Sequence, residues 1–282
     1  ADGLDILIVL AGHTGHNRLA VAAHRPAPIQ VSFHDLATSG LSVMDAWITD
    51  PMLHPEDTRE RFTEKLVRLP CFYLHEPPDK SPGPGPLPAL GAGHVTFGSF
   101  NHVAKLTPEV LAVWAQLLKY CTGSRLKICG VPDGQVAARL TEPFVRMGID
   151  PDRLQLLPRL PRSRFHSEIA DTDIALDPFP YCGGATTCES LWMGLPVIAL
   201  AGDFGFSRSS SAILAQVGLT ELVANSVDDY LRNAASLADG DLLTTRKSMR
   251  DRMRSSELMN EAGFVGRLEE AYRKLAYARA GA

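Results

Sequence analysis

The alternation of short apolar segments with longer amphipathic ones is the feature that most constrains how this chain can fold. Apolar segments at 94–100, 125–129 and 154–157 have the length and composition of buried strands, and the segments between them, at 107–121 and 135–147, favour helix. Strands that alternate with helices of about 10–15 residues indicate parallel βαβ units in a doubly wound sheet. Such sheets bind ligands at the carboxyl ends of their strands.

The segment at 171–202 continues this alternation and contains the most distinctive turn of the sequence. A strand is expected at 174–176 and a helix at 187–193, and Gly183 and Gly184 free the backbone between them. A glycine-flanked helix start after a strand offers unpaired N–H donors and a partial positive charge to a phosphate group. The same pattern also fits an ordinary capped turn of an α/β domain.

Three side chains near this turn could contact a ligand. Thr186 and Thr187 suit a helix N-terminus, because their hydroxyls can satisfy its unpaired N–H groups. Glu189 could favour the helix dipole or accept both hydroxyls of a ribose. Lys105 lies in the loop after the strand at 94–100, where its ammonium could reach a diphosphate or remain in solvent.

The first part of the chain contains a second group of expected strands. Apolar segments at 5–10, 29–33 and 46–49 fit strands, the first of them a buried parallel strand, and a short helix is expected at 19–24. His13 lies in the turn after the first strand, where it could hydrogen-bond to a ligand or to the backbone.

A stretch rich in proline and glycine separates these two groups of strands. This composition is typical of a linker, and we expect one at 81–93. The chain would then consist of a first domain at 1–80, a second domain at 94–255 and a C-terminal segment at 256–282. The last segment has the apolar spacing of an amphipathic helix.

The bulk composition disfavours several classes of protein. The net charge of −4 gives no basic footprint for nucleic acid or for an acidic membrane surface. No apolar run approaches the roughly 18 to 20 residues needed to span a bilayer. Five cysteines at no metal-ligand spacing suggest reduced thiols in a cytoplasmic protein. No Gly-x-Gly-x-x-Gly follows an expected strand, which disfavours a nicotinamide dehydrogenase.

Two segments of the second domain resemble a known family. They are Gly-Gly-Ala-Thr-Thr-Cys-Glu-Ser-Leu-Trp-Met-Gly-Leu-Pro at 183–196 and Phe-Gly-Ser-Phe-Asn-His-Val-Ala-Lys-Leu-Thr-Pro at 97–108. The first is similar to the donor-nucleotide loop, and the second to the phosphate-binding segment, of the O-GlcNAc transferase and SPINDLY family of glycosyltransferases. Leu-Ala-Gly-His-Thr at 10–14 also resembles the N-terminal catalytic lobe of that family. The resemblance extends over nearly the whole chain.

This resemblance implies the α/β architecture called GT-B, in which two Rossmann-like lobes face a cleft. Residues 1–80 would be the C-terminal part of an incomplete N-terminal catalytic lobe, and residues 94–255 the lobe that binds the nucleotide sugar. The segment at 256–282 would be a helix that braces the two lobes.

The resemblance also implies a set of functional residues. Lys105 and His13 would be catalytic. Lys105 and the helix start would stabilise the leaving diphosphate, and Glu189 would hold the ribose. His166 would either border the base or lie on a solvated helix face, and Arg162 and Arg164 would be phosphate neighbours or plain surface charge. The implied nucleotide-binding residues are Asn101, His102, Lys105, Leu160, Arg162, His166, Gly184, Ala185, Thr186, Thr187 and Glu189.

The implied activity is inverting, metal-independent transfer of a sugar to serine or threonine hydroxyls of a protein or peptide, with no cofactor. UDP-GlcNAc is the expected donor. GDP-fucose, which SPINDLY-type members use, is an alternative, and so is a nucleotide-sugar-binding module without catalysis. Because tetratricopeptide repeats usually precede the catalytic region in this family, we expect them upstream in the full-length protein. Nucleic acid and membranes are not expected partners.

Two features depart from the family pattern. Where family members commonly carry Trp-Leu-Gly-Tyr-Pro, this chain has Phe-His-Asp-Leu-Ala at 33–37, in a loop that faces the cleft in the family. The family's N-terminal lobe also normally includes an upstream His-Pro segment whose histidine is important for catalysis, and this sequence does not contain it. Either the chain is a fragment of a longer enzyme, or it is a shortened paralogue without activity.

Overall fold

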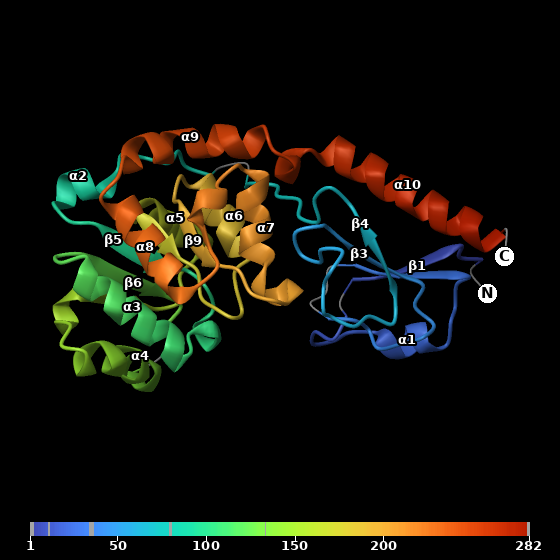
Figure 1. Cartoon of the computed structure of the whole chain (residues 1–282), viewed down its shortest axis with the longest axis horizontal. Coiled ribbons are helices and arrows are strands. Elements are labelled where there is room, and N and C mark those ends of the chain that lie inside the picture. Colours follow the sequence, from blue (N-terminus) through green and yellow to red (C-terminus); the bar gives the residue numbers. More distant parts are fainter. Residues whose placement is uncertain (1–2, 11, 34–36, 79–80, 133, 281–282) are drawn as a thin grey trace. The chain divides into compact units, whose positions relative to one another are not determined.

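The chain divides into two compact units, each with its own parallel sheet (Figure 1). Unit 1 consists of Ala1–Leu74, Asp203–Phe206 and Glu257–Ala282, and unit 2 of His75–Gly202 and Ser207–Ser256. This computed structural model describes residues 3–10, 12–33, 37–78, 81–132 and 134–280.

Unit 1 contains a four-stranded parallel sheet with the strands in chain order. The strands are β1 (Ile6–Val9), β2 (Ile29–Ser32), β3 (Ala46–Thr49) and β4 (Lys65–Arg68), and the short helix α1 (Leu19–Ala23) follows β1. The expectation that the first strand is buried is wrong: β1 lies at an edge of this sheet, and its residues are partly exposed. Strand β4 was not predicted, because the charged ends of Lys-Leu-Val-Arg hide its apolar centre.

Polar side chains connect the strands of unit 1. Asp45, just before β3, accepts a hydrogen bond of 2.8 Å from the Gln30 N–H of β2 and pairs with Arg25 at 2.9 Å.

The C-terminal helix α10 (Glu261–Ala280) belongs to this unit, and the ring of Phe264 stacks on that of Phe33 with their centroids 6.1 Å apart.

Unit 2 contains a six-stranded parallel sheet in the order β10-β9-β8-β5-β6-β7. The chain runs outward from β5 to β7, crosses to β8 on the other side of β5, and then runs outward to β10. This is the doubly wound order, and in such sheets ligands bind at the carboxyl ends of the strands where the order reverses, here between β5 and β8. The strands are β5 (Thr96–Ser99), β6 (Arg125–Cys129), β7 (Leu154–Leu157), β8 (Ile174–Leu176), β9 (Val197–Leu200) and β10 (Val223–Ala224).

Helices cover both faces of this sheet (Figure 1). Helix α3 packs against α4 and α8, and α6 packs against α7 and α9. The Pro/Gly-rich stretch at 81–93 contains α2, and the Ser81 hydroxyl accepts a hydrogen bond of 2.7 Å from Trp192 within the same unit. The helices are α2 (Pro88–Ala92), α3 (Pro108–Tyr120), α4 (Gly134–Arg146), α5 (Arg162–Ala170), α6 (Ala185–Trp192), α7 (Ser209–Gln216), α8 (Val227–Ala238) and α9 (Leu242–Arg254).

A buried tyrosine connects two helices of unit 2 to the end of β8. The Tyr230 hydroxyl of α8 accepts a hydrogen bond of 3.1 Å from the Trp114 indole of α3 and donates one of 3.0 Å to the Asp177 carbonyl oxygen. Both rings are fully buried, and burial raises the pKa of Tyr230 well above its usual value. The hydroxyl therefore stays neutral and satisfies two groups that water cannot reach.

Replacing Tyr230 with phenylalanine tests this arrangement. Because Tyr230→Phe leaves a buried indole N–H and a carbonyl without a partner, we expect it to reduce the free energy of unfolding by about 1–3 kcal/mol. Urea unfolding followed by circular dichroism would measure the change. The control is Tyr120→Phe, since Tyr120 is 66% exposed and its replacement should have an effect within about 0.5 kcal/mol. Equal effects of the two variants would contradict the assignment.

Candidate functional site

The candidate site lies at the carboxyl ends of β5 and β8, where the strand order reverses. The loop after β5 holds Asn101 and continues into the 3-10 helix η1 (Val103–Lys105), and Asp177 directly follows the end of β8. The Lys105 ammonium donates hydrogen bonds of 3.2 Å to the Asn101 side-chain oxygen and 2.8 Å to the Cys182 carbonyl oxygen. The two glycosyltransferase-like segments of the sequence therefore meet at this point.

Asp177 is the buried centre of this arrangement. Its carboxylate accepts hydrogen bonds from the Gly183 N–H, at 2.9 and 3.1 Å to its two oxygens, and from the Asn101 amide at 3.1 Å. Burial raises the pKa of Asp177 to about 6, although its hydrogen bonds and the Lys105 charge oppose this rise. Near neutral pH the group is therefore an ionised carboxylate that holds the glycine turn in place.

The glycine turn is shaped by close packing. A Cβ atom at Gly183 would lie 2.5 Å from the Thr187 hydroxyl oxygen and 2.7 Å from a carboxylate oxygen of Asp177. Real Cβ atoms do not approach other atoms so closely, so no residue other than glycine fits here without rearrangement. Glycine is therefore required at position 183 because there is no space for a side chain beside Asp177 and Thr187; that it also frees the backbone stays a prediction.

Helix α6 begins at Ala185 with Gly184 as its N-cap, and within the described part of the chain no side chain caps it. The expectation that a threonine hydroxyl caps this helix is wrong, because both hydroxyls bond elsewhere. The Thr186 hydroxyl donates a hydrogen bond of 3.1 Å to Asn101. Thr187 is buried, and its hydroxyl lies 2.9 Å from that of Ser210. The helix start therefore retains N–H groups that an anion could bind.

Lys105 supplies a positive charge beside this helix start. Its ammonium lies 4.5 Å from the centroid of the Tyr181 ring, close enough for a cation–π interaction. Burial lowers the pKa of Lys105, while the nearby charge of Asp177 raises it. A second anion, such as a diphosphate, would favour the charged form of Lys105 further.

Glu189 faces two basic side chains of α5. The Glu189 carboxylate lies 3.5 Å from the guanidinium of Arg162 and 3.8 Å from Nε2 of His166. His166 is 5% exposed, so the alternative that places it on a solvated helix face is wrong. Because Arg162 is largely exposed, its ion pair with Glu189 is weak. Glu189 can therefore exchange this contact for hydroxyl groups of a ligand.

The other candidate residues of unit 2 have simpler surroundings. His102 is exposed, and its Nδ1 accepts a hydrogen bond of 3.1 Å from the Ala104 N–H, which caps η1. Leu160 is half-buried in the loop before α5. Arg164 lies 3.7 Å from Glu168 of the same helix, an ordinary surface ion pair.

His13 belongs to unit 1, whereas the residues described so far belong to unit 2. Its Nε2 atom lies 2.9 Å from the Thr38 carbonyl oxygen, and its side chain is exposed. The altered family loop at 33–37 includes His34, Asp35 and Leu36, which lie outside the described residues.

Sequence reasoning missed three residues of the site. It assigned no role to Asp177, although a carboxylate directly after a buried strand and before a glycine turn was a usable signal. Ser210 donates a hydrogen bond of 2.9 Å to the Gly183 carbonyl oxygen from α7, and Tyr181 covers Lys105. No local pattern marks these two contacts, because they depend on how the helices pack.

Two features of other kinds of protein are absent from the described part of the chain. Among the residues that the structure describes, no three His, Cys, Asp or Glu side chains form a group that could hold a metal ion. No helix in the described part of the chain is long and apolar enough to cross a membrane.

Comparison with known proteins identifies relatives of this chain. The family model for glycosyl transferase family 41 matches residues 1–76 and 88–266. The chain is 41% identical to the "Probable UDP-N-acetylglucosamine--peptide N-acetylglucosaminyltransferase SPINDLY" of Petunia hybrida, over 97% of this chain and 30% of that protein. It is 40% identical to the Arabidopsis thaliana protein of the same description, over 97% of this chain and 31% of that protein. The chain thus spans about 30% of the length of these curated relatives.

Solved structures agree on the fold. A mutant of the Thermobaculum terrenum O-GlcNAc transferase superposes with a TM-score of 0.90 at 37% identity, over 99% of this chain and 54% of that one. The pneumococcal O-GlcNAc transferase in complex with UDP and GlcNAc has a TM-score of 0.56 at 14% identity, over 98% of this chain and 57% of that one, which supports the fold alone. The two parallel sheets have GT-B-like neighbours, and the chain belongs to glycosyl transferase family 41.

Proposed function

We propose that this chain is the catalytic region of an inverting glycosyltransferase that moves GlcNAc from UDP-GlcNAc to serine or threonine hydroxyls of a protein. Three groups after the ends of β5 and β8 carry this proposal. They are Lys105, the start of α6, which has no side-chain cap, and the Glu189 carboxylate. The names of the family relatives, which specify a UDP-GlcNAc donor and a peptide acceptor, support it.

In this proposal the site acts on the leaving group. Departure of UDP places negative charge on its β-phosphate, and Lys105 and the N–H groups at the start of α6 are arranged to stabilise that charge. Since these groups are held in place before the donor binds, little reorganisation is needed when the charge develops. They would fill the role that a divalent cation has in other transferases, so we expect no metal requirement.

Glu189 would hold the ribose, with Arg162 and His166 beside it. A carboxylate can accept both ribose hydroxyls at once, which fixes the nucleoside relative to the diphosphate. Positioning of the donor in this way contributes to catalysis by reducing the entropy lost on the way to the transition state. For His13, the support for a catalytic role is the family-like segment at 10–14.

Isothermal titration with UDP and with GDP tests the proposal, each in magnesium and again in EDTA. We expect UDP to bind more tightly than GDP, with the same affinity in both buffers. A preference for GDP would favour transfer of fucose instead. Binding of neither nucleotide would contradict a nucleotide site here. Because the relatives are longer, transfer to a peptide should be assayed in the full-length protein, where UDP binding without turnover would indicate a binding module.

Replacing Lys105 with alanine should weaken UDP binding by about 1.5–3 kcal/mol, because the variant loses a charged hydrogen bond to the diphosphate. Titration calorimetry would measure this change. The matched control is Lys119→Ala on the exposed end of α3, which should leave UDP affinity unchanged. If the two variants bind UDP equally well, Lys105 does not contact the diphosphate.

Replacing Glu189 with alanine should weaken UDP binding about tenfold while changing pyrophosphate binding by less than twofold. The reason is that Glu189 contacts the ribose, which pyrophosphate lacks, and a lost hydrogen bond of this kind costs on the order of 1.4 kcal/mol. Competition between each ligand and a fluorescent UDP analogue would report both affinities. A parallel loss for the two ligands would exclude a specific ribose contact.

A further inference from the structure

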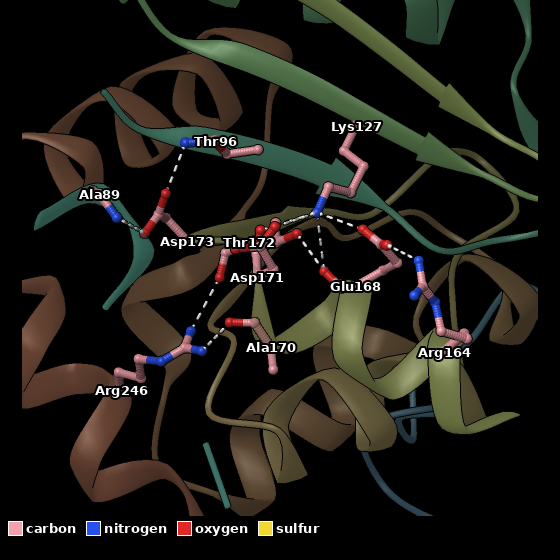
Figure 2. Close-up of polar contacts among 10 residues, drawn as sticks. All are labelled: Ala89, Thr96, Lys127, Arg164, Glu168, Ala170, Asp171, Thr172, Asp173 and Arg246. Carbon is pink, nitrogen blue, oxygen red and sulfur yellow. Dashed lines mark hydrogen bonds and ion pairs between the residues drawn. The ribbon is translucent and has the colours of Figure 1, made fainter. Parts of the chain in front are cut away.

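Two buried cations meet at the carboxyl end of α5 (Figure 2), whereas Arg162 is the first residue of this helix. Lys127 of β6 and Arg246 of α9 are each 1% exposed. The Lys127 ammonium donates hydrogen bonds of 3.0 Å to the Asp171 carbonyl oxygen and 3.3 Å to that of Glu168, and it lies 2.9 Å from the Glu168 carboxylate. We call this cluster the α5 junction, defined by Lys127, Glu168, Ala170, Asp171, Thr172, Asp173 and Arg246.

Arg246 completes the cap of α5 from the other side (Figure 2). Its guanidinium donates a hydrogen bond of 3.0 Å to the Thr172 carbonyl oxygen and another to that of Ala170. The last carbonyl groups of a helix have no partner within the helix and carry a partial negative charge. The two cations therefore satisfy both the hydrogen-bonding capacity and the charge of this helix end.

A cation buried in a strand is unusual enough to require a reason. Removing a lysine from water costs several kcal/mol, and apolar residues of similar volume often stabilise a protein as well or better. Lys127 lies in β6, where both neighbours, Leu126 and Ile128, are buried and apolar. Fold stability alone therefore does not account for a lysine at this position. A role in fixing where α5 ends does account for it.

The opposite end of α5 carries the nucleoside side of the proposed site. Arg162 and His166 are four residues apart and so lie on one face of the helix, where both face Glu189. Helix α5 spans nine residues, which is about 13 Å. A short helix moves as a rigid rod, so a shift at its carboxyl end would displace His166 relative to Glu189.

The α5 junction also fixes the start of β8. The Asp173 carboxylate accepts hydrogen bonds of 2.9 Å from the Ala89 N–H and 2.8 Å from the Thr96 N–H (Figure 2). Strand β8 begins at the next residue and ends at Leu176, directly before Asp177, the buried carboxylate of the site. These two hydrogen bonds are made by Asp173 and involve neither Lys127 nor Arg246, so replacing either cation leaves them in place.

We propose that Lys127 and Arg246 are positioning residues of the nucleotide site, which hold the nucleoside-binding end of α5 in place by capping its carboxyl end. This inference rests on the proposed function, because it assigns the α5 end to the nucleoside. Neither residue contacts the ligand. The diphosphate groups are held by η1 and α6, which do not depend on the α5 cap.

The first test replaces Lys127 with methionine and compares UDP with pyrophosphate. We expect the affinity for UDP to fall about five- to tenfold and that for pyrophosphate to change less than twofold, because only the nucleoside end of the site moves. A general loss of folded structure would weaken both ligands equally, and that outcome would overturn the proposal. So would unchanged affinity for UDP.

A double variant separates positioning from the cost of an unpaired charge. Lys127→Met removes the buried cation 2.9 Å from the Glu168 carboxylate and leaves it only the longer contact with Arg164 at 3.7 Å, which destabilises the protein in itself. Lys127→Met with Glu168→Gln removes both charges and should recover much of the thermal stability, but not the affinity for UDP, since the helix end is still uncapped. Recovery of UDP affinity together with stability would show that Lys127 acts only through stability.

Should Lys127→Met fail to fold, Arg246→Lys offers a milder change. It keeps the positive charge but loses the planar guanidinium, whose separate nitrogens donate to the carbonyl groups of Thr172, Ala170 and Pro84. We therefore expect the same selective loss for UDP at about two- to fourfold. Loss of pyrophosphate affinity to the same extent, or no loss for either ligand, would overturn the proposal.

Hydrogen exchange distinguishes failure of this inference from failure of the proposed function. In the ligand-free protein, the capping variants should speed exchange of the hydrogen-bonded amides along the whole of α5, beginning with Phe165, whose N–H donates to the Pro161 carbonyl oxygen. Faster exchange confined to the carboxyl end would overturn the inference even if UDP binds. If α5 responds as a whole but the unmodified protein binds neither UDP nor pyrophosphate, then the proposed function fails while the mechanical coupling stands.

Discussion

The buried carboxylate of Asp177 is the interaction on which the arrangement of unit 2 depends. It orients the glycine turn through Gly183, and it orients Asn101, which in turn holds Lys105 and Thr186. Ionising it has a cost. A pKa of about 6 in the folded state, against an ordinary value near 4, means that its contribution to stability falls as the pH rises from about 4 to 6, by on the order of 3 kcal/mol. The remaining contacts of the unit offset that cost.

The charged groups of the α5 junction have a different role from those of the proposed ligand site. At the α5 junction, cations and carboxylates neutralise each other and cap backbone groups. At the carboxyl edge, the donors at the start of α6 are left without a side-chain cap. Buried polar networks that are fully satisfied make a structure rigid, and groups left available bind ligands. The polar groups of the α5 junction therefore support the fold, whereas those at the carboxyl ends of the strands are available to bind a ligand.

Much of the fold could be predicted because its signals are local. Strands β6, β7 and β8 agree with the predicted ranges, since each is a short apolar segment between turn residues. Helix α8 and strand β4 were missed, because α8 is rich in acidic and small residues and β4 has charged ends. Burial of a side chain in the site was harder to predict. The residues around His166 in the sequence are those of an ordinary helix, and the side chain is buried only because of how α5 packs within unit 2.

The contacts in the site also explain why the hydroxyl groups were misassigned. Sequence rules treat a threonine at a helix start as a cap, which is its commonest role. Here two of the groups that would bind the donor already have internal partners: Lys105 contacts a carbonyl and an amide oxygen, and Glu189 faces two cations. Such partners hold the side chains near their binding positions, and a ligand needs only to replace or extend contacts that already exist. Preorganisation of this kind lowers the entropy lost on binding. A site that satisfies itself in this way is therefore difficult to recognise from residue types alone, because the same residues that bind a ligand also complete the fold.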